Sequence, residues 1–162
     1  MDRLWSPWRF RYVSHASPET ECIFCAKASA GDDEQNLILF RGKTCFVLLN
    51  LFPYTTGHLM IAPYAHAASL LDCPAETLHE IIDLTAAAER HLRAVYHPQG
   101  LNAGLNLGEC AGAGVAGHIH LHVLPRWAGD ANFMTTVAET RVMPEDLSET
   151  WRKLSAAFRG GN

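Results

Sequence analysis

The sequence predicts an α+β fold: an antiparallel β-sheet with one long helix and a C-terminal helix. Three observations support this fold. Short apolar runs of strand length come first, a long stretch with apolar residues at helical spacing follows, and a second group of strands precedes a final helix. With 162 residues, 48% of them hydrophobic, the chain suits one compact domain.

The strands are predicted from short apolar or alternating runs. Residues 37–40 and 45–49 lie on either side of Gly42, which indicates two antiparallel strands joined in a hairpin. Residues 58–62 form the next apolar run, and residues 101–107 alternate as a strand does. These segments, with a further strand described below, make the expected sheet.

Two helices are predicted from their start signals and apolar spacing. The long helix is expected to begin at Pro74, with Glu76 near the positive end of the helix dipole, and to stop before Pro98. Residues 143–158 are expected to form the C-terminal helix, with Pro144 in its opening turn. The apolar stripe of the long helix, which is expected to pack on the sheet, comprises Leu78, Ile81, Ile82, Thr85, Ala88, Leu92, Val95 and Tyr96.

The chain divides into three expected parts. Residues 1–21 are interpreted as an N-terminal arm, residues 22–140 as the folded domain, and residues 141–162 as a C-terminal helix and tail. The sequence contains no internal repeat and no low-complexity linker, which agrees with a single domain.

The net charge, the apolar runs and the cysteines of the chain indicate which classes of partner to expect. A formal net charge of -4 at pH 7 argues against binding to a nucleic-acid backbone, which requires a surface of Lys and Arg. No apolar run reaches membrane-spanning length and no signal-peptide core is present, so we expect no membrane partner and a cytoplasmic location. Five cysteines, an odd number, are expected to be reduced thiols or metal ligands. The expected partner is therefore a small molecule.

Three histidines alternate with apolar residues in the last predicted strand, residues 118–124. His118, His120 and His122 are expected on one face, because successive strand side chains point to opposite faces. Rings at this spacing span roughly 13 Å, too far for one zinc ion with bonds of about 2.0–2.1 Å to bind all three easily. The pattern favours a central nucleophile with two supporting partners. One ring nitrogen of His120 must then be unprotonated, and the other should donate to a backbone carbonyl.

This motif, which continues through Pro125 and Arg126, resembles that of the histidine triad superfamily. Residues 46–63 resemble the family's hairpin segment, so the resemblance covers roughly Cys22 to Arg126. It implies the family's antiparallel sheet with flanking helices. It also implies nucleotidyl transfer, in which the middle histidine attacks an α-phosphate and holds a nucleoside monophosphate covalently until an acceptor releases it.

The resemblance assigns roles to individual residues. His120 would be the nucleophile, His122 would contact phosphate oxygens or the leaving group, and His58 would approach the same phosphates. Asn50 would contact the ribose, because its amide can both donate and accept hydrogen bonds.

The segment that lines the phosphates in relatives corresponds to Asn106 and the glycine-rich stretch around Gly114. Relatives often carry Ser or Thr just before the triad, where this chain has Val115-Ala116-Gly117. We therefore expect backbone amides to bind the phosphate here.

Cys22 and Cys25 are separated by two residues, a spacing that lets both sulfurs bind one tetrahedral zinc ion. Two further ligands are needed. Some bacterial triad proteins and the related uridylyltransferases use a histidine after the strand and the first triad histidine, which correspond to His66 and His118. The resemblance thus implies a structural zinc site.

Segments 4–9 and 126–134 resemble the diadenosine polyphosphate hydrolase and phosphorylase branch. The leading hypothesis is a nucleotidyl hydrolase or transferase that cleaves the α-phosphate linkage of a dinucleoside polyphosphate such as diadenosine tetraphosphate. Phosphorylases in related families often replace the third histidine by glutamine, so His122 favours hydrolysis. The resemblance also suggests a homodimer.

Four alternatives remain open at this point. The chain could be a diadenosine polyphosphate phosphorylase or an adenosine phosphoramidase, both using the same covalent chemistry. It could be a zinc-dependent hydrolase whose histidines hold a metal that activates water. It could also be a non-catalytic nucleotide-binding module.

Overall fold

The computed structural model describes residues 21–131, 133–138 and 142–160, so the predicted N-terminal arm lies outside the described residues except for Glu21. The strands are β1 (Ile38–Arg41), β2 (Cys45–Leu49), β3 (Leu59–Pro63), β4 (Gly100–Leu105) and β5 (Leu121–Arg126). The α-helices are α2 (Ile23–Ser29), α3 (Ala75–Tyr96), α4 (Phe133–Val137) and α5 (Leu147–Gly160), and short 3-10 turns lie at Leu70–Asp72 and Glu109–Ala111.

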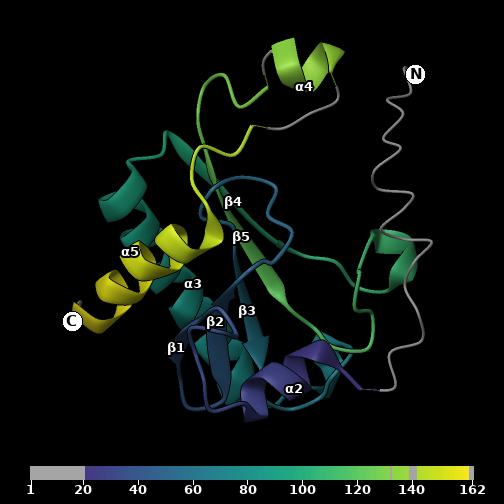
Figure 1. The fold of residues 1–162 in the computed structure, drawn as a ribbon. Coiled ribbons are helices and arrows are strands. Elements are labelled where there is room, and N and C mark those ends of the chain that lie inside the picture. The colour runs from purple at the N-terminus through teal and green to yellow at the C-terminus, as the bar shows by residue number, and fades with distance from the viewer. Residues whose placement is uncertain (1–20, 132, 139–141, 161–162) are drawn as a thin grey trace.

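The five strands form one antiparallel sheet in the order β1-β2-β3-β5-β4 (Figure 1). Together with the helices they make an α+β fold, as predicted, and β1 and β2 form the predicted hairpin. The crossover of α3 between β3 and β4 leaves β5 in the interior of the sheet, between those two strands. His122, which lies in β5, is thereby held by strand neighbours on both sides.

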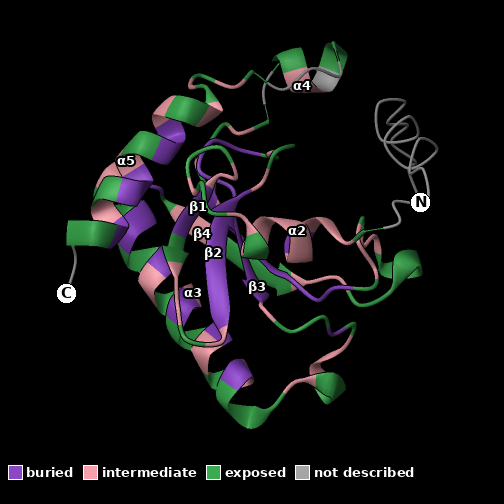
Figure 2. Ribbon diagram, turned by 60° about the horizontal axis from the view of Figure 1, so that its bottom comes forward, coloured by how far each residue is buried: buried purple, intermediate pink, exposed green. Residues whose placement is uncertain are grey.

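Helices cover both faces of the sheet. Because side chains alternate along β2, Val47 and Leu49 join the core under α3 and α5, whereas Phe46 and Leu48 face α2. All five residues of β2 are buried, which marks it as a central strand (Figure 2). The core on the α3 and α5 side also includes Leu59, Ile61, Leu84, Ala88, Leu92, Leu121, Val123, Trp151, Leu154 and Phe158.

The histidine strand begins later than predicted. The sequence predicted a strand at residues 118–124, whereas β5 is Leu121–Arg126 and its ladder with β3 stops at Leu121. The next residue of β3 available to Ile119 would be Pro63, which has no N–H to donate. Ile119 donates its own N–H to Ala67 O (2.6 Å) instead. The first two triad histidines therefore lie in an irregular segment just before the strand.

The predicted end of this strand at residue 124 is also wrong, because β5 runs on to Arg126. Pro125 pairs with Leu101 of β4, and β3 contacts β5 only as far as Val123. At this end β5 has one strand neighbour instead of two, an edge-like position that tolerates proline. Arg126 thus still belongs to the sheet.

The long helix has the predicted bounds but a different buried face. It ends where His97 adopts the left-handed conformation with φ 47°. Ile82 from the predicted stripe is 63% exposed, whereas Leu84 and His91 are buried. The buried face is thus rotated around the helix axis relative to the predicted stripe, because the helix packs on α5 as well as on the sheet.

The C-terminal helix begins at Leu147, later than the predicted residue 143. The side chain of Asp146 accepts hydrogen bonds from the Glu149 N–H and the Ser148 hydroxyl, both at 2.8 Å, and so caps the helix. Pro144 lies before this cap. The short helices α2 and α4 were not predicted, and α4 lies apart from the sheet in Figure 1. Among the described residues, no helix has the length and apolar character needed to cross a bilayer.

Candidate active site and metal-ligand cluster

The turn that ends at Gly57 places His58 directly before β3. Gly57 has φ +78°, and a Cβ there would lie 3.1 Å from Leu92 and 3.2 Å from Tyr96. Only glycine fits this close approach without displacing its neighbours. His58 follows with 1% of its surface exposed, and its carbonyl oxygen accepts the N–H of Asn50 (3.0 Å). The glycine thus allows the chain to bury His58 beside the histidine segment.

His58 and His122 form a hydrogen-bonded pair, with His58 Nε2 and His122 Nδ1 2.9 Å apart. The N–H of Tyr54 donates to His58 Nδ1 (3.2 Å), so His58 carries its proton on Nε2 and donates it to His122. The neutral His122 ring then keeps its own proton on Nε2. The pair therefore presents the Nε2–H of His122 as a donor, because the Nδ1 of that ring is occupied by His58.

Burial keeps this pair uncharged. Burial, together with the like charges of His122 and His120, lowers the pKa of His58 to about 3. Burial and the neighbouring His120 lower the pKa of His122 to about 4. Both rings are neutral at pH 7, as the hydrogen-bond assignment requires.

His120 presents a free ring nitrogen. Its Nδ1–H donates to the carbonyl oxygen of His118 (2.8 Å), so the lone pair lies on Nε2. The expected backbone carbonyl partner is thus present. Burial lowers the pKa of His120, although the bond to His118 opposes the shift. The His120 ring lies edge-on to the His122 ring, with centroids 4.8 Å apart, so the two imidazoles are neighbours.

The predicted nucleotide-binding residues lie in two places. Asn50 lies beside His58, with its Nδ2 3.4 Å from His58 Nδ1, and its Oδ1 accepts the N–H of Phe52 (2.9 Å). Asn106 follows β4 and donates to Gly112 O (3.4 Å), which ties the glycine-rich loop to the sheet. Gly114 is exposed in that loop. The structure therefore brings Asn50 to the histidines and places the other two in the loop that leads to His118.

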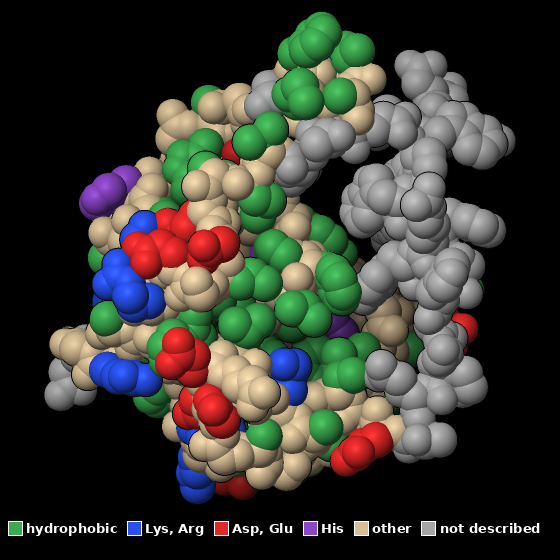
Figure 3. Space-filling model, in the orientation of Figure 1, with side chains coloured by type: hydrophobic (Ala, Val, Ile, Leu, Met, Phe, Trp, Pro, Cys, Tyr) green, Lys and Arg blue, Asp and Glu red, His purple; other side chains and the backbone are tan. Residues whose placement is uncertain are grey.

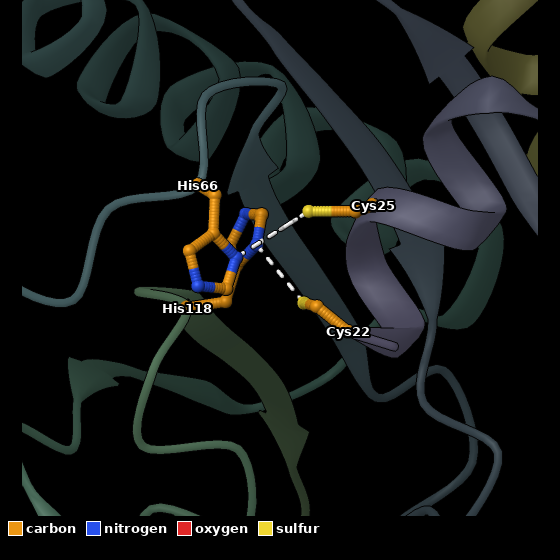
Figure 4. Close-up of side chains that lie close together, drawn as sticks. All are labelled: Cys22, Cys25, His66 and His118. Carbon is orange, nitrogen blue, oxygen red and sulfur yellow. Dashed lines mark hydrogen bonds between the residues drawn. The ribbon is translucent and has the colours of Figure 1, made fainter. Parts of the chain in front are cut away.

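The four predicted metal ligands come together from distant parts of the chain. Cys22 and Cys25 belong to the start of α2, His66 follows β3, and His118 precedes β5 (Figure 4). One donor atom from each residue lies within 4.8 Å of every other. The Cys22 and Cys25 sulfurs lie 3.2 and 3.6 Å from His118 Nδ1, and Cys25 Sγ lies 3.4 Å from His66 Nδ1. No other group of three or more His, Cys, Asp or Glu among the described residues is close enough to hold a metal ion.

The chemistry of this cluster fits zinc. Two sulfurs and two imidazole nitrogens are a donor set of the kind that structural zinc takes, and the three sulfur-to-nitrogen separations of 3.2, 3.4 and 3.6 Å are compatible with bonds of about 2.0–2.3 Å to one ion. His118 Nε2–H donates to Pro63 O (2.9 Å), which leaves the Nδ1 lone pair directed at the cluster. Burial and the adjacent Cys22 raise the pKa of the Cys25 thiol, and a cation bound at the cluster would favour the thiolate.

Sequence reasoning missed the groups that hold these rings in place. Phe24 is buried with its ring centroid 4.7 Å from that of His120. The Tyr54 ring lies 4.8 Å from that of His58. Phe24 lies between the two predicted zinc ligands, a position from which a contact with the triad could have been inferred. The hydrogen bond from the Tyr54 N–H to His58 could not have been inferred, because every residue other than proline has a backbone N–H.

A cavity of about 210 Å³ lies on the other side of His58, between the turn at Pro53–Gly57 and the start of α5. Leu49, Leu147 and Thr150 contribute to its lining, whereas His120 and His122 do not. It is smaller than the usual ligand pocket of about 300–1,000 Å³. On the face shown in Figure 3, a small area of histidine is visible among hydrophobic side chains.

The sequence model of the HIT domain matches residues 32–129. This chain belongs to the HIT family. A HIT-family relative from Mycobacterium tuberculosis, named AP-4-A phosphorylase, is 38% identical over 165 residues, covering 98% of this chain and 85% of the relative. Protein hit of Bacillus subtilis is 30% identical and covers 78% of this chain and 86% of its own length.

Solved structures of HIT proteins share the fold. The crystal structure of a Zn-bound histidine triad family protein from Mycobacterium smegmatis has 32% sequence identity and a TM-score of 0.70, and the match covers 86% of this chain and 94% of that one. A diadenosine triphosphate hydrolase from Plasmodium falciparum, at 16% identity and a TM-score of 0.62, resembles this chain in fold. The HIT fold, the triad and a zinc-type donor set thus occur together in this chain.

Proposed function

We propose that this HIT protein is an enzyme that cleaves dinucleoside polyphosphates at an α-phosphate through a nucleotidyl-His120 intermediate. The observation that carries the proposal is the lone pair on His120 Nε2, fixed by the Nδ1–H bond to His118 O (2.8 Å) beside the ring of His122. The relative named AP-4-A phosphorylase, 38% identical over 98% of this chain, supports the choice of substrate class.

In the first step, the lone pair on His120 Nε2 forms a bond to the α-phosphorus. The bond between that phosphorus and the bridging oxygen breaks, and the remaining nucleoside polyphosphate leaves with the electron pair. The His120 Nδ1–H stays bonded to His118 O, which stabilises the positive charge that the ring acquires when Nε2 becomes substituted.

His122 and His58 stabilise the negative charge that moves onto the phosphate oxygens and the leaving group. His122 Nε2–H is the available donor, because Nδ1 already accepts from His58. Tyr54 N–H fixes the tautomer of His58 and, through it, the tautomer of His122. The donor is therefore prepared before substrate binds and needs no protonation change at neutral pH.

In the second step, an acceptor oxygen attacks the same phosphorus, the N–P bond breaks and its electron pair returns to His120 Nε2. With diadenosine tetraphosphate, the first step releases ATP. Inorganic phosphate as acceptor then gives ADP, whereas water gives AMP. We propose inorganic phosphate as the main acceptor, supported by the name of the relative that matches 98% of this chain. Related phosphorylases often carry glutamine at the position of His122, and on that comparison the sequence favours water as the acceptor. The His122 ring, however, can donate a hydrogen bond to either water or phosphate.

Asn50, Asn106 and Gly114 are proposed to bind the nucleotide. Asn50 lies 3.4 Å from the ring of His58, close enough to the reacting phosphate for its amide to contact the adjoining ribose. Asn106 anchors the loop at Gly112, whose φ of 91° is available to glycine. Loop amides around the exposed Gly114 then face the phosphates without a Ser or Thr hydroxyl.

Zinc is proposed as a structural ion held by Cys22, Cys25, His66 and His118. The donor set supports this, and so does the Zn-bound relative at 32% identity. The thiols must stay reduced to bind the ion, which favours the cytoplasm.

A homodimer is also proposed. Strand β4 lies at the sheet edge with its central residues exposed, and such an edge can pair with a second copy.

The test is a panel of diadenosine polyphosphates and an adenosine phosphoramidate, each incubated with and without inorganic phosphate. The proposal predicts ADP and ATP from diadenosine tetraphosphate with phosphate. AMP and ATP irrespective of phosphate would identify a hydrolase, and preferential cleavage of the phosphoramidate would identify a phosphoramidase. No cleavage of any substrate by the zinc-loaded protein would contradict the proposed function.

A further inference from the structure

One end of α2 carries three side chains that converge on the histidines. Cys22 and Cys25 face His118 Nδ1 at 3.2 and 3.6 Å. Phe24 lies between them in the chain and is 1% exposed. Its ring packs against those of His118 and His120, with centroids 5.1 and 4.7 Å apart. The segment that supplies both sulfurs therefore also supplies a wall beside the nucleophile.

His118 joins the cluster to His120 directly. Its Nδ1 faces the two sulfurs, its Nε2–H donates to Pro63 O (2.9 Å), and its carbonyl oxygen accepts the Nδ1–H of His120 (2.8 Å). The residue is completely buried, at 0% exposure, so it is packed on all sides. A displacement of His118 would therefore move the carbonyl that orients His120.

The fourth member of the cluster ties in another segment. His66 Nδ1 lies 3.4 Å from Cys25 Sγ, and the next residue, Ala67, accepts the N–H of Ile119 at 2.6 Å. Ile119 lies between the proposed metal ligand His118 and the proposed nucleophile His120. The segment after β3 thus contacts both α2, through His66, and the residues before β5, through Ala67.

We propose that metal binding at Cys22, Cys25, His66 and His118 positions His120 for nucleotidyl transfer, through the His118 carbonyl and the Phe24 ring. The inference rests on the proposed function, because both concern the same nucleophile. A bound zinc supplies bonds that join α2, the segment after β3 and the segment before β5. Phe24 is a positioning residue, and the His118 carbonyl is a positioning group.

The first comparison uses Cys22→Ser/Cys25→Ser and the control Cys73→Ser. The double variant removes both sulfurs from the cluster, whereas Cys73 lies outside it and its Sγ donates to Ser69 O. We expect the double variant to lose its zinc and to form adenylyl-His120 from diadenosine tetraphosphate at least about tenfold more slowly. Cys73→Ser should match the wild type in zinc content and in rate.

Two readouts do not depend on catalysis. At fixed pH, the imidazole ¹⁵N spectrum of His120 should show one tautomer, protonated on Nδ1, in zinc-loaded wild type, and a mixture in the double variant. Amide exchange of Ile119 should accelerate at least about tenfold in the double variant. Wild type stripped of zinc by a chelator should show the same two changes, and added zinc should reverse them.

Phe24→Leu tests the second connection separately, because it leaves all four proposed ligands in place. We expect unchanged zinc content, about threefold or greater slowing of adenylyl-His120 formation, and a mixed His120 tautomer. An unchanged rate and a single tautomer would contradict the role of the Phe24 ring.

The proposal is overturned if wild type binds no zinc, or if the zinc-free forms keep the single His120 tautomer and the Ile119 protection. A failure of the proposed function looks different. Zinc-loaded protein would then show the metal-dependent tautomer and exchange but would cleave none of the nucleotide substrates.

Discussion

Each imidazole nitrogen in the pair His58 and His122 has a defined state. Tyr54 N–H occupies His58 Nδ1, and the 2.9 Å bond between the rings occupies His58 Nε2 and His122 Nδ1. On His120, the His118 carbonyl takes Nδ1–H. The two free positions, a lone pair on His120 Nε2 and a donor on His122 Nε2, are the ones that phosphoryl chemistry requires. The proposed mechanism therefore uses neutral rings, in agreement with the lowered pKa values of all three histidines.

The depressed pKa of His122, about 4, predicts the acid side of the pH profile. Because the ring stays neutral well below its ordinary value near 6.5, kcat/KM should remain within about twofold between pH 8 and about pH 5.5. The measurement is initial rate against pH at low substrate and constant ionic strength. A loss of activity that titrates with an apparent pKa near 6.5 would show that the histidines are not buried in this way.

His58 also links stability to pH. Its folded pKa of about 3 lies below the unfolded value near 6.5, so protons bind the unfolded chain more tightly. Its contribution to stability is complete above about pH 6.5 and is lost as the pH falls from there toward about 3. The free energy of unfolding of His58→Asn, measured with urea at several pH values, should fall less steeply over this range than that of wild type. Equal slopes would contradict the assignment.

At the scale of elements, Glu80 of α3 holds the β1–β2 turn to the helix. Its carboxylate accepts the N–H groups of Lys43, Thr44 and Cys45. Burial alone would raise the pKa of Glu80, but these bonds and the Thr44 hydroxyl lower it below the usual range. A Cβ at Gly42 would lie 2.5 Å from Glu80 Oε1, so the glycine makes room for this contact. The contact fixes the hairpin against α3.

We therefore expect Glu80→Ala to lower the free energy of unfolding by about 2 kcal/mol, because three backbone donors lose a charged acceptor. Glu89→Ala is the matched control on the same helix. Glu89 pairs with Arg93 on the surface, and its loss should cost less than about 0.5 kcal/mol. Urea unfolding of both variants at pH 7 makes the measurement. Equal effects would show that the turn is held by other contacts.

Local sequence signals predicted some elements better than others. The hairpin and α3 follow from apolar runs and helix boundaries, and both lie where predicted. The start of β5 does not, because it depends on Pro63 in a neighbouring strand far away in the chain. The start of α5 depends on whether Asp146 or a nearby residue caps it, and spacing alone could not decide this.

For the site, residue types were predictable and their connections were not. The triad spacing and the Cys22 and Cys25 pair indicated candidate site residues, and the structure brings those two cysteines together with His66 and His118. The sequence predicted a backbone carbonyl partner for His120 but not which one, and the contact between the rings of Phe24 and His120 forms only when α2 packs against the histidine segment.

At the scale of the whole molecule, the metal-ligand cluster connects α2 to the segment before β5, which is more than 90 residues away in the chain. A bond network across such a long loop stabilises the fold by restricting the unfolded chain as well as by binding energy. His118, one of the four proposed ligands, accepts the Nδ1–H of His120, so a metal ion bound at the cluster would affect both folding and the proposed nucleophile.

Untreated protein should therefore contain about one equivalent of zinc per chain, and removing it should lower the melting temperature by about 5 °C or more. Elemental analysis and a thermal unfolding scan with and without a chelator make the measurement. Less than about half an equivalent of zinc, with no response to added zinc, would contradict the structural metal site.

The central claim is that His120 carries the nucleotidyl group. Zinc-loaded protein mixed with diadenosine tetraphosphate, quenched in alkali within milliseconds and mapped by mass spectrometry, should carry one adenylyl group on the peptide that contains His120. His120→Ala should carry none and should lose at least about 10³-fold in kcat. Turnover by the wild type with the adduct on another residue, or undiminished turnover by His120→Ala, would contradict the account.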